Sequence, residues 1–518
     1  MVDNAVASQT ADQVADPIVA SPTYMADIRF FFRPEDVDHM GAKGIDLGTY
    51  DGVKRNALAV LAHTAPPNAD MPPDPAGQWS ANRSQTFRNW ILNGYPVGTA
   101  TQPGNGTTGT QPGTGTGTQP GSGTTTTPPD RLRKNVATLT AQEIQTLATA
   151  FSGLMAKEPS DPGSYFTLAG YHGLPQSWCM HHIDQFNPWH RVYLKTFEDA
   201  LRSVPGCQDV TLPYWDISTP LPDALQQPPF DSYVLPQDPG ATADPPEPGT
   251  YFPYTTSRFP LDTIAANLQQ NGVLDDITTS LSQSRWGVYN VNGYQDFSIQ
   301  AHDGGHVSVG PTMGDQNVSA YDPVFWFYHC NIDRLWLRWQ NNVQGATLTG
   351  FTSTIDGDAS WLTAPPSNAL PPFSTTTGAT IAYGISYDDE GPEVTVENPV
   401  GSIAAAHSFS IKSSAPVSVR VKDIDRLNIP GSFVVKLLAE GQPIAQRAFF
   451  QPNRPQNCAN CRKQALVNID FRIDQSELVD RTLSVQIDVV GHQDIGASFP
   501  LSQAGNPTIN ARLLLDGA

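Results

Sequence analysis

The chain has 518 residues, of which 50 are acidic and 30 are basic, and its net charge is −20. This length suffices for two or three domains that each bury a core, while the negative surface disfavours nucleic acid and anionic lipid as partners. No apolar run approaches the ~20 residues that a bilayer crossing needs, and the first residues lack the pattern of a signal peptide. We therefore expect a soluble, cytoplasmic protein with no membrane partner.

The N-terminal part of the sequence predicts a small helical domain and a linker. Residues 1–97 form an extension of unknown role, in which 48–63 and 84–94 have helical composition. Its core would be closed by Trp79, Phe87, Trp90 and Ile91. Residues 98–130 are almost entirely Gly, Thr, Pro and Gln, a composition that predicts a flexible linker.

Two further regions complete the expected architecture. Residues 131–390 predict a mainly α catalytic core, with helix starts at Asn187-Pro188 and Asp322-Pro323.

From 400 to 518 the apolar residues instead alternate with period two, as in 417–421 and 483–487, and Glu440-Gly441 marks a turn. This pattern predicts an antiparallel β C-terminal domain.

Seven of the eleven histidines lie in two clusters, which core histidines rarely do. The first cluster comprises His172, His181, His182 and His190, and the second comprises His302, His306 and His329. His302 and His306 are one helical turn apart, so both rings can reach one metal ion. Imidazole ligands suit copper and zinc, and the sequence therefore predicts a three-histidine metal site in each half.

Two other metal chemistries fit the sequence less well. Di-iron helical sites use bridging carboxylates, whereas the closest glutamate to a cluster histidine, Glu198, comes two turns after His190. The run from His302 to His306 has the spacing of a zinc-peptidase H-E-x-x-H motif, but Asp303 replaces its glutamate and the first cluster stays unexplained. Its two glycines each cost a helix ~1 kcal/mol, which we interpret as a bare surface beside the metals.

From about Arg131 to Tyr387 the sequence resembles the tyrosinase, catechol oxidase and molluscan haemocyanin family. The resemblance rests on YHGLPQSWCMHHIDQFNPWHRVYLKTFE at 171–198, AHDGGHVSVGPTM at 301–313 and DPVFWFYHCNIDRLWLRW at 322–339. It implies a four-helix bundle that holds two copper ions, with O2 as co-substrate. By this alignment the copper ligands are His172, His181 and His190 for one ion and His302, His306 and His329 for the other, while His182 is a neighbour.

The resemblance also suggests roles for three residues beside the ligands. Cys179 is expected to form a thioether with His181, with a buried free thiol as the alternative. Family members often place an asparagine, helped by a glutamate, where this chain has Asp303, which could accept a phenol proton or orient His302. Gln295 and Gln300 are weak substitutes for the helping glutamate, and Gln316 lies at the substrate-gate position.

The C-terminal domain resembles the lid of latent fungal tyrosinases. In that resemblance Phe449 is the aromatic ring that occupies the copper site in place of substrate, although Phe450 follows it and ordinary core is the alternative for the pair. Cys458 and Cys461 resemble a copper-loading pair; a local disulfide or two idle thiols are the alternatives.

The predicted function is copper-dependent oxidation of monophenols and ortho-diphenols to ortho-quinones by O2. A catechol oxidase or an ortho-aminophenol oxidase would use the same ligands without hydroxylating monophenols, and a haemocyanin-like protein would carry O2 without consuming it. The expected partners are small phenols, and the surface also permits homo-oligomers.

Overall fold

The structure is a computed structural model that describes residues 18–20, 22–41, 43, 45–64, 71, 78–92, 95–97, 131–247, 249–287, 293–389, 416–478, 480–491 and 498–513. The predicted linker at 98–130 lies outside these residues. The chain divides into two compact units, Met1–Thr124 and Thr125–Ala518. Among the residues described, none of the helices combines the length and apolarity needed to cross a bilayer.

The first unit contains a small helical domain. Its elements are η1 Ile28–Phe31, α1 Pro34–Gly41, α2 Tyr50–Thr64 and α3 Ala81–Leu92. Trp79, Phe87 and Trp90, three of the four residues expected to close its core, are buried in one aromatic cluster with Tyr24 and Ile28. Ile91 is partly buried against this cluster.

The second unit begins with a helical core. Its elements are β1 Arg131–Arg133, η3 Val136–Thr138, α4 Ala141–Met155, α5 Tyr165–Gly170, α6 Phe186–Arg202, η4 Asp223–Gln226, α7 Leu261–Gln270, α8 Val273–Ser282, α9 Tyr294–Val309, η5 Ser319–Tyr321, α10 Val324–Asn342, α11 Leu348–Thr352, α12 Ser360–Thr363, η6 Gly378–Thr380 and β2 Ile385–Tyr387.

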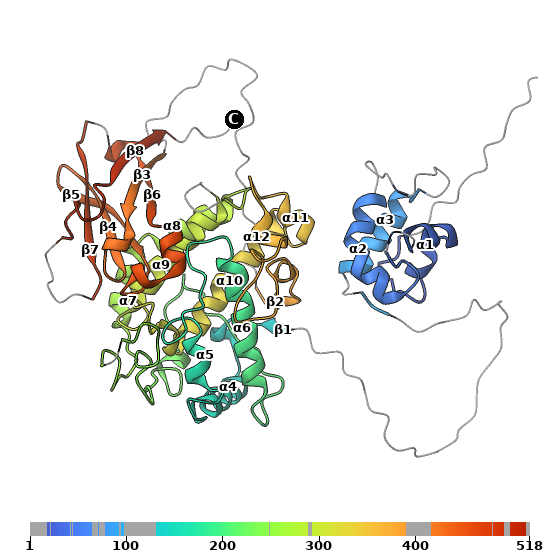
Figure 1. Ribbon diagram of the computed structural model, residues 1–518, viewed down its shortest axis with the longest axis horizontal. Coiled ribbons are helices and arrows are strands. Elements are labelled where there is room, and N and C mark those ends of the chain that lie inside the picture. The colour runs from blue at the N-terminus through green and yellow to red at the C-terminus, as the bar shows by residue number, and fades with distance from the viewer. Residues whose placement is uncertain are drawn as a thin grey trace, which may run out of the picture. The chain divides into compact units, whose positions relative to one another are not determined.

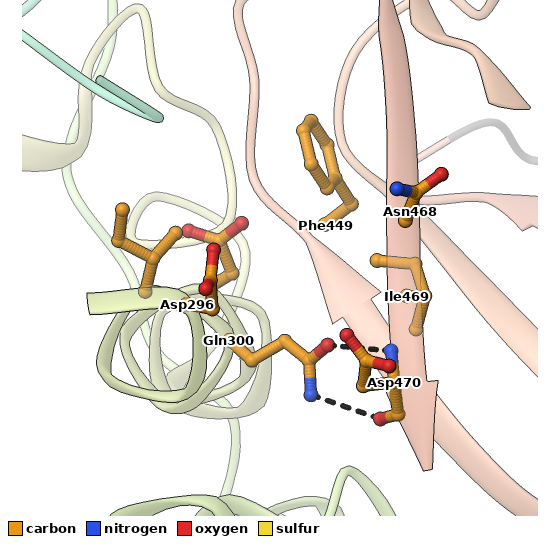
Figure 2. Close-up of a pocket in the computed structure, with 8 residues that line it drawn as sticks. Asp296, Gln300, Phe449, Asn468, Ile469 and Asp470 are labelled. Carbon is orange, nitrogen blue, oxygen red and sulfur yellow. Dashed lines mark hydrogen bonds between the residues drawn. The ribbon is translucent and has the colours of Figure 1, made fainter. Parts of the chain in front are cut away.

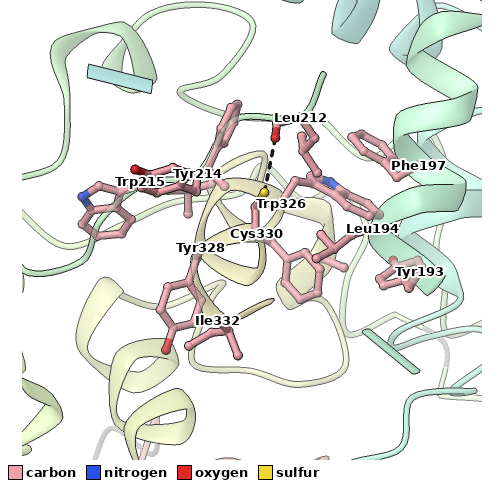
Figure 3. Close-up of a cluster of buried hydrophobic side chains, with 14 of the residues drawn as sticks. Tyr193, Leu194, Phe197, Leu212, Tyr214, Trp215, Trp326, Tyr328, Cys330 and Ile332 are labelled. Carbon is pink, nitrogen blue, oxygen red and sulfur yellow. Dashed lines mark hydrogen bonds between the residues drawn. The ribbon is translucent and has the colours of Figure 1, made fainter. Parts of the chain in front are cut away.

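Helices α6 and α10 pack through large aromatic side chains. The rings of Phe197 and Trp326 stack with centroids 3.5 Å apart, and the thiol of Cys330 donates to the Leu212 carbonyl at 3.2 Å (Figure 3). Helix α10 begins at Val324, one residue after the expected start, with Pro323 as its N-cap, and Asp322 accepts from the backbone N–H of Val324. The start of α6 was predicted too late, because the helix begins at Phe186 and Asn187 lies inside it.

A β domain follows, formed by β3 Pro416–Asp425, η7 Arg426–Asn428, β4 Phe433–Ala439, β5 Gln442–Phe449, η8 Pro455–Asn457, α13 Ala459–Lys463, β6 Leu466–Asp474, η9 Gln475–Glu477, β7 Leu483–Val489 and β8 Thr508–Leu513. Two antiparallel sheets, ordered β6-β3-β8 and β5-β4-β7, share one hydrophobic core. The predicted turn joins β4 to β5, with positive φ at both Glu440 and Gly441. This is the backbone that a two-residue hairpin favours.

The β domain packs against the helical core beside α7, α8 and α9 (Figure 1). A buried ion pair joins Arg447 of β5 to Asp276 of α8 at 2.7 Å, and Gln446 donates to Asn271 at 2.9 Å. Polar side chains therefore fix the position of β5, which leads directly into the histidine cluster.

Candidate metal centre

The six histidines predicted as ligands form one buried cluster. His190 lies on α6, His302 and His306 on α9, and His329 on α10, while His172 and His181 lie in the segment between α5 and α6. The Nε2 atoms of His172 and His181 are 3.2 Å apart, and those of His306 and His329 are 2.9 Å apart. No side chain of the six is more than 5% exposed.

The outward-facing nitrogens of four of these rings have hydrogen-bond partners. Nδ1 of His190 lies 2.8 Å from the Phe186 carbonyl, and Nδ1 of His306 lies 2.9 Å from that of Met313. A carbonyl oxygen only accepts, so in both rings the proton is on Nδ1 and the lone pair is on Nε2. The remaining two contacts join His172 to Ser319 at 3.2 Å and His302 to Asp303 at 2.9 Å.

The inward-facing nitrogens fit a pair of metal ions. The Nε2 atoms of His190 and His302 are buried without a hydrogen-bond partner. Burial lowers the pKa of His190 and of His306 to about 3, so these rings are neutral, as metal ligation requires. Converging lone pairs on neutral imidazoles repel one another unless a cation lies between them, and an all-imidazole donor set suits copper.

A buried ionic network holds α6 and α10 in register behind the histidines. Asp333 of α10 accepts from Arg191 of α6 at 2.6 Å and from the Tyr387 hydroxyl at 2.7 Å. Arg133 of β1 donates to Glu198 of α6 at 2.9 Å. The sequence alone does not reveal this network, since such charged residues resemble a solvated surface until their partners are known.

Gly304 and Gly305 of α9 have a different structural role from the predicted one. A Cβ on Gly305 would lie 2.1 Å from the Tyr328 hydroxyl, and one on Gly304 would lie 2.9 Å from Val273. The glycines therefore allow α10 and α8 to pack closely against α9, and the prediction of a bare surface beside the metals is wrong.

His182 is turned away from the six converging rings. Its Nε2 lies 2.8 Å from Oδ2 of Asp303, and its Nδ1 lies 3.2 Å from the guanidinium of Arg426. Asp303 also contacts His302 through Oδ1 and accepts at Oδ2 from the backbone N–H of Phe450 at 3.0 Å. Burial raises the pKa of Asp303, and the Phe450 hydrogen bond and the Arg426 charge oppose that rise. This geometry favours the role of Asp303 as an orienter of His302.

The expected helpers of Asp303 are engaged elsewhere. Gln295 donates to the Ile183 carbonyl, while Gln300 bonds the backbone N–H and C=O of Asp470 in β6 (Figure 2). A cavity of about 20 Å³ lies beside Gln300 and Asp303, which is room for one water. Glu247, the glutamate that precedes Asp303 most closely in the sequence, accepts instead from Asn317 at 3.2 Å.

The aromatic ring that occupies the site belongs to Phe450, and the prediction of Phe449 is wrong. Phe450 stacks on His306 with centroids 4.1 Å apart and lies 5.5 Å from the His181 ring. Phe449 stacks instead on His182 at 4.3 Å and on Phe433 of the β core at 4.9 Å. Adjacent residues at the end of a strand point to opposite faces, and the pattern does not reveal which face meets the histidines.

Cys179 and Gln316 lie together beside the cluster. The Gln316 amide nitrogen is 3.2 Å from the Cys179 sulfur, and the other amide atom, Oε1, is buried without a partner. The sulfur and ring nitrogens of His172 and His181 lie within 4.8 Å of one another. Burial raises the pKa of the Cys179 thiol to about 12. The thioether and the gate stay predictions.

Cys458 and Cys461 form a disulfide, with Cα atoms 5.2 Å apart. In this state the sulfurs cannot bind a soft ion as thiolates, so the alternative of a local disulfide describes the structure and the favoured copper-loading pair does not. The pair nevertheless lies close to the site, since Asn460 contacts the Cys179 carbonyl at 3.5 Å.

Comparison with known proteins shows that this part of the chain is similar to tyrosinases and hemocyanins. Residues 162–342 match the family model for the common central domain of tyrosinase. The tyrosinase HcTyr2 of Hahella sp. is 24% identical over 68% of this chain and 90% of its own length. Hemocyanin type 2 unit e of Rapana venosa is 32% identical over 40% of this chain and 54% of its own length.

Solved structures show the same fold. A tyrosinase from Burkholderia thailandensis matches 74% of this chain and all of its own, with a TM-score of 0.52 and 21% identity. A functional unit of octopus hemocyanin matches 73% of this chain and 99% of its own, with a TM-score of 0.53 and 19% identity. The helical core followed by antiparallel sheets is therefore a tyrosinase-like fold.

Proposed function

We propose that this protein, which carries the central domain of the tyrosinase family, is a copper oxidase that converts phenols to ortho-quinones. The observation that carries the proposal is the buried cluster of six histidines, in which ring nitrogens without protein partners converge. His172, His181 and His190 would hold one copper ion, and His302, His306 and His329 the other. The predicted four-helix bundle belongs to this proposal, with α6, α9 and α10 as ligand-bearing helices.

The bound copper pair would supply O2 binding and the electron transfer that oxidises the phenol. The protein supplies six buried imidazoles, four of which have a hydrogen-bond partner that fixes the ring. Two catechols are oxidised to two ortho-quinones while one O2 is reduced to two waters.

The position of the Phe450 ring is an argument for an aromatic substrate. Its ring is stacked on His306 at an interplanar angle of 13°, so the cluster accommodates a planar ring there. In this proposal the β domain is a lid, and a phenol enters where Phe450 leaves.

Oxygen consumption tests the proposal. The copper-loaded chain and the variant Phe450→Ala would be given tyramine without a diphenol primer, with catechol as the control substrate. Uptake on both substrates supports a tyrosinase, and uptake on catechol alone identifies a catechol oxidase. Reversible O2 binding without consumption would instead favour the haemocyanin-like alternative, which the hemocyanin relatives keep open.

A further inference from the structure

A chain of four polar side chains joins the β domain to a predicted copper ligand. Arg426 of η7 contacts Nδ1 of His182 at 3.2 Å, and Nε2 of His182 lies 2.8 Å from Oδ2 of Asp303. Oδ1 of Asp303 lies 2.9 Å from Nδ1 of His302. None of the four residues is more than 1% exposed, so water does not substitute for any link.

The direction of each hydrogen bond follows from Arg426. A guanidinium only donates, so Nδ1 of His182 accepts and the proton of the neutral ring is on Nε2. His182 therefore donates to Asp303.

Asp303 accepts hydrogen bonds from both the helical core and the β domain. Its Oδ2 accepts from His182 and from the Phe450 backbone, and its Oδ1 accepts from His302. The Nδ1–H of His302 is thereby fixed, and Nε2 keeps its lone pair for a metal. The backbone of His182 has a φ of 59°, a left-handed conformation that is uncommon for residues other than glycine and marks a conformation held by its surroundings.

We propose that His182 is a positioning residue that couples docking of the β domain to the copper affinity of His302, through Asp303. The inference rests on the proposed copper site. Docking places Arg426 on His182, fixes the tautomer that donates to Asp303, and so holds His302 in its ligating orientation. The β domain then does more than block access with Phe450, because it also supports one of the two copper ions.

Two substitutions of His182 separate its two contacts. His182→Asn retains a polar group near Nδ1, which reaches Arg426, and loses the contact with Asp303; asparagine also tolerates the left-handed backbone. His182→Gln retains an N–H near Nε2, which reaches Asp303, and loses the contact with Arg426. The full-length chain, loaded with two copper ions, would be titrated with a chelator to measure the release of each ion.

We expect about a tenfold weaker affinity for one of the two ions in His182→Asn and near-normal affinity in His182→Gln, as is typical when a hydrogen bond to a metal ligand is lost. Arg426→Met should weaken the same ion in the wild-type background and have no effect in the His182→Gln background. Equal affinities in wild type and His182→Asn, or an equal effect of Arg426→Met in both backgrounds, would overturn the coupling.

Arg447→Met is the matched control, because it removes another buried arginine between the same domains without touching His182. Its copper affinity should stay much closer to that of the wild type than the affinity of Arg426→Met does, because the contact between Arg426 and His182 remains. A loss as large as that of Arg426→Met would mean that general loosening of the β domain explains the effect, and would also overturn the proposal. Failure of the wild-type chain to bind two copper ions would contradict the proposed function itself, before any variant is compared.

Discussion

The helical core and the β domain contact the histidine cluster in different ways. The core holds His190 and His306 through backbone carbonyls of Phe186 and Met313, which no substitution removes. The β domain reaches the cluster through the Phe450 ring and through the side chain of Arg426. The framework that holds His190 and His306 is thus built into the core, whereas access to the cluster, and in our proposal the orientation of His302, depends on contacts that can be released.

The largest effect on copper binding and O2 uptake is expected from loss of a proposed ligand that belongs to the helical core. His329→Ala removes a ring whose Nε2 is 2.9 Å from that of His306. We expect the bound copper to fall from two ions to one per chain, with loss of O2 uptake on catechol, because one ion loses a ligand. Metal analysis of the purified variant measures this.

His182→Asn is the comparison for that experiment, since His182 lies in the same region but faces Asp303. It should retain two copper ions when copper is in excess. A variant at His329 that still held two ions would remove this histidine from the ligand set.

Substitutions of Phe449 and Phe450 test how the β domain contacts the histidine cluster. Phe449 is part of the β-domain core, so Phe449→Ala should lower the free energy of unfolding by about 3–5 kcal/mol. Phe450→Ala should instead raise O2 uptake on catechol, because it removes the ring stacked on His306. Thermal or denaturant unfolding and an oxygen electrode separate the effects, and greater activation by Phe449→Ala would reverse our assignment of the occupying ring.

The sequence predicted the core better than the interface. Helical spacing placed His302 and His306 on one face of α9, because a local period depends on neighbouring residues alone. It could not show that Phe450 rather than Phe449 meets the cluster, since both strand faces are buried and the docking partner is distant in sequence. It also missed the chain from Arg426 to Asp303, whose contacts span more than a hundred residues.

The start of α6 is another feature that the sequence alone did not predict correctly. Asn187-Pro188 has the composition of a helix start, yet the helix begins at Phe186, whose carbonyl supports His190. Packing of Phe186 within the histidine cluster outweighs the local capping preference. Tertiary contacts of this kind cannot be derived from one sequence.

The interface predicts a pH effect at Asp276, which is buried against Arg447. Burial raises the pKa of Asp276 from 3.8 to about 6, so the folded protein keeps a proton that the unfolded chain releases between these values. The stabilisation from this group is fully present below about pH 4 and is lost as the pH rises through 6. The two-unit shift corresponds to about 3 kcal/mol.

Asp276→Asn should therefore unfold with a weaker pH dependence between pH 4 and 7 than the wild type, in a denaturant titration at each pH. The exposed Asp209 of the helical core offers the control, since Asp209→Asn should leave the wild-type profile unchanged. Identical profiles for wild type and Asp276→Asn would show that this carboxyl titrates normally in the folded chain.

The smallest effect on stability is expected at Gln316, which lies beside Cys179 at the histidine cluster and has an incomplete set of hydrogen bonds. Its Oε1 is buried without a partner, which costs about 1–3 kcal/mol, so Gln316→Leu should raise the free energy of unfolding by about 1 kcal/mol. The control Gln270→Leu changes an exposed glutamine and should stay within about 0.5 kcal/mol of the wild type. If Gln316 also gates substrate, the KM for phenols of different polarity will shift in Gln316→Leu and not in the control. Unchanged KM values with increased stability would assign this residue to packing beside Cys179 alone.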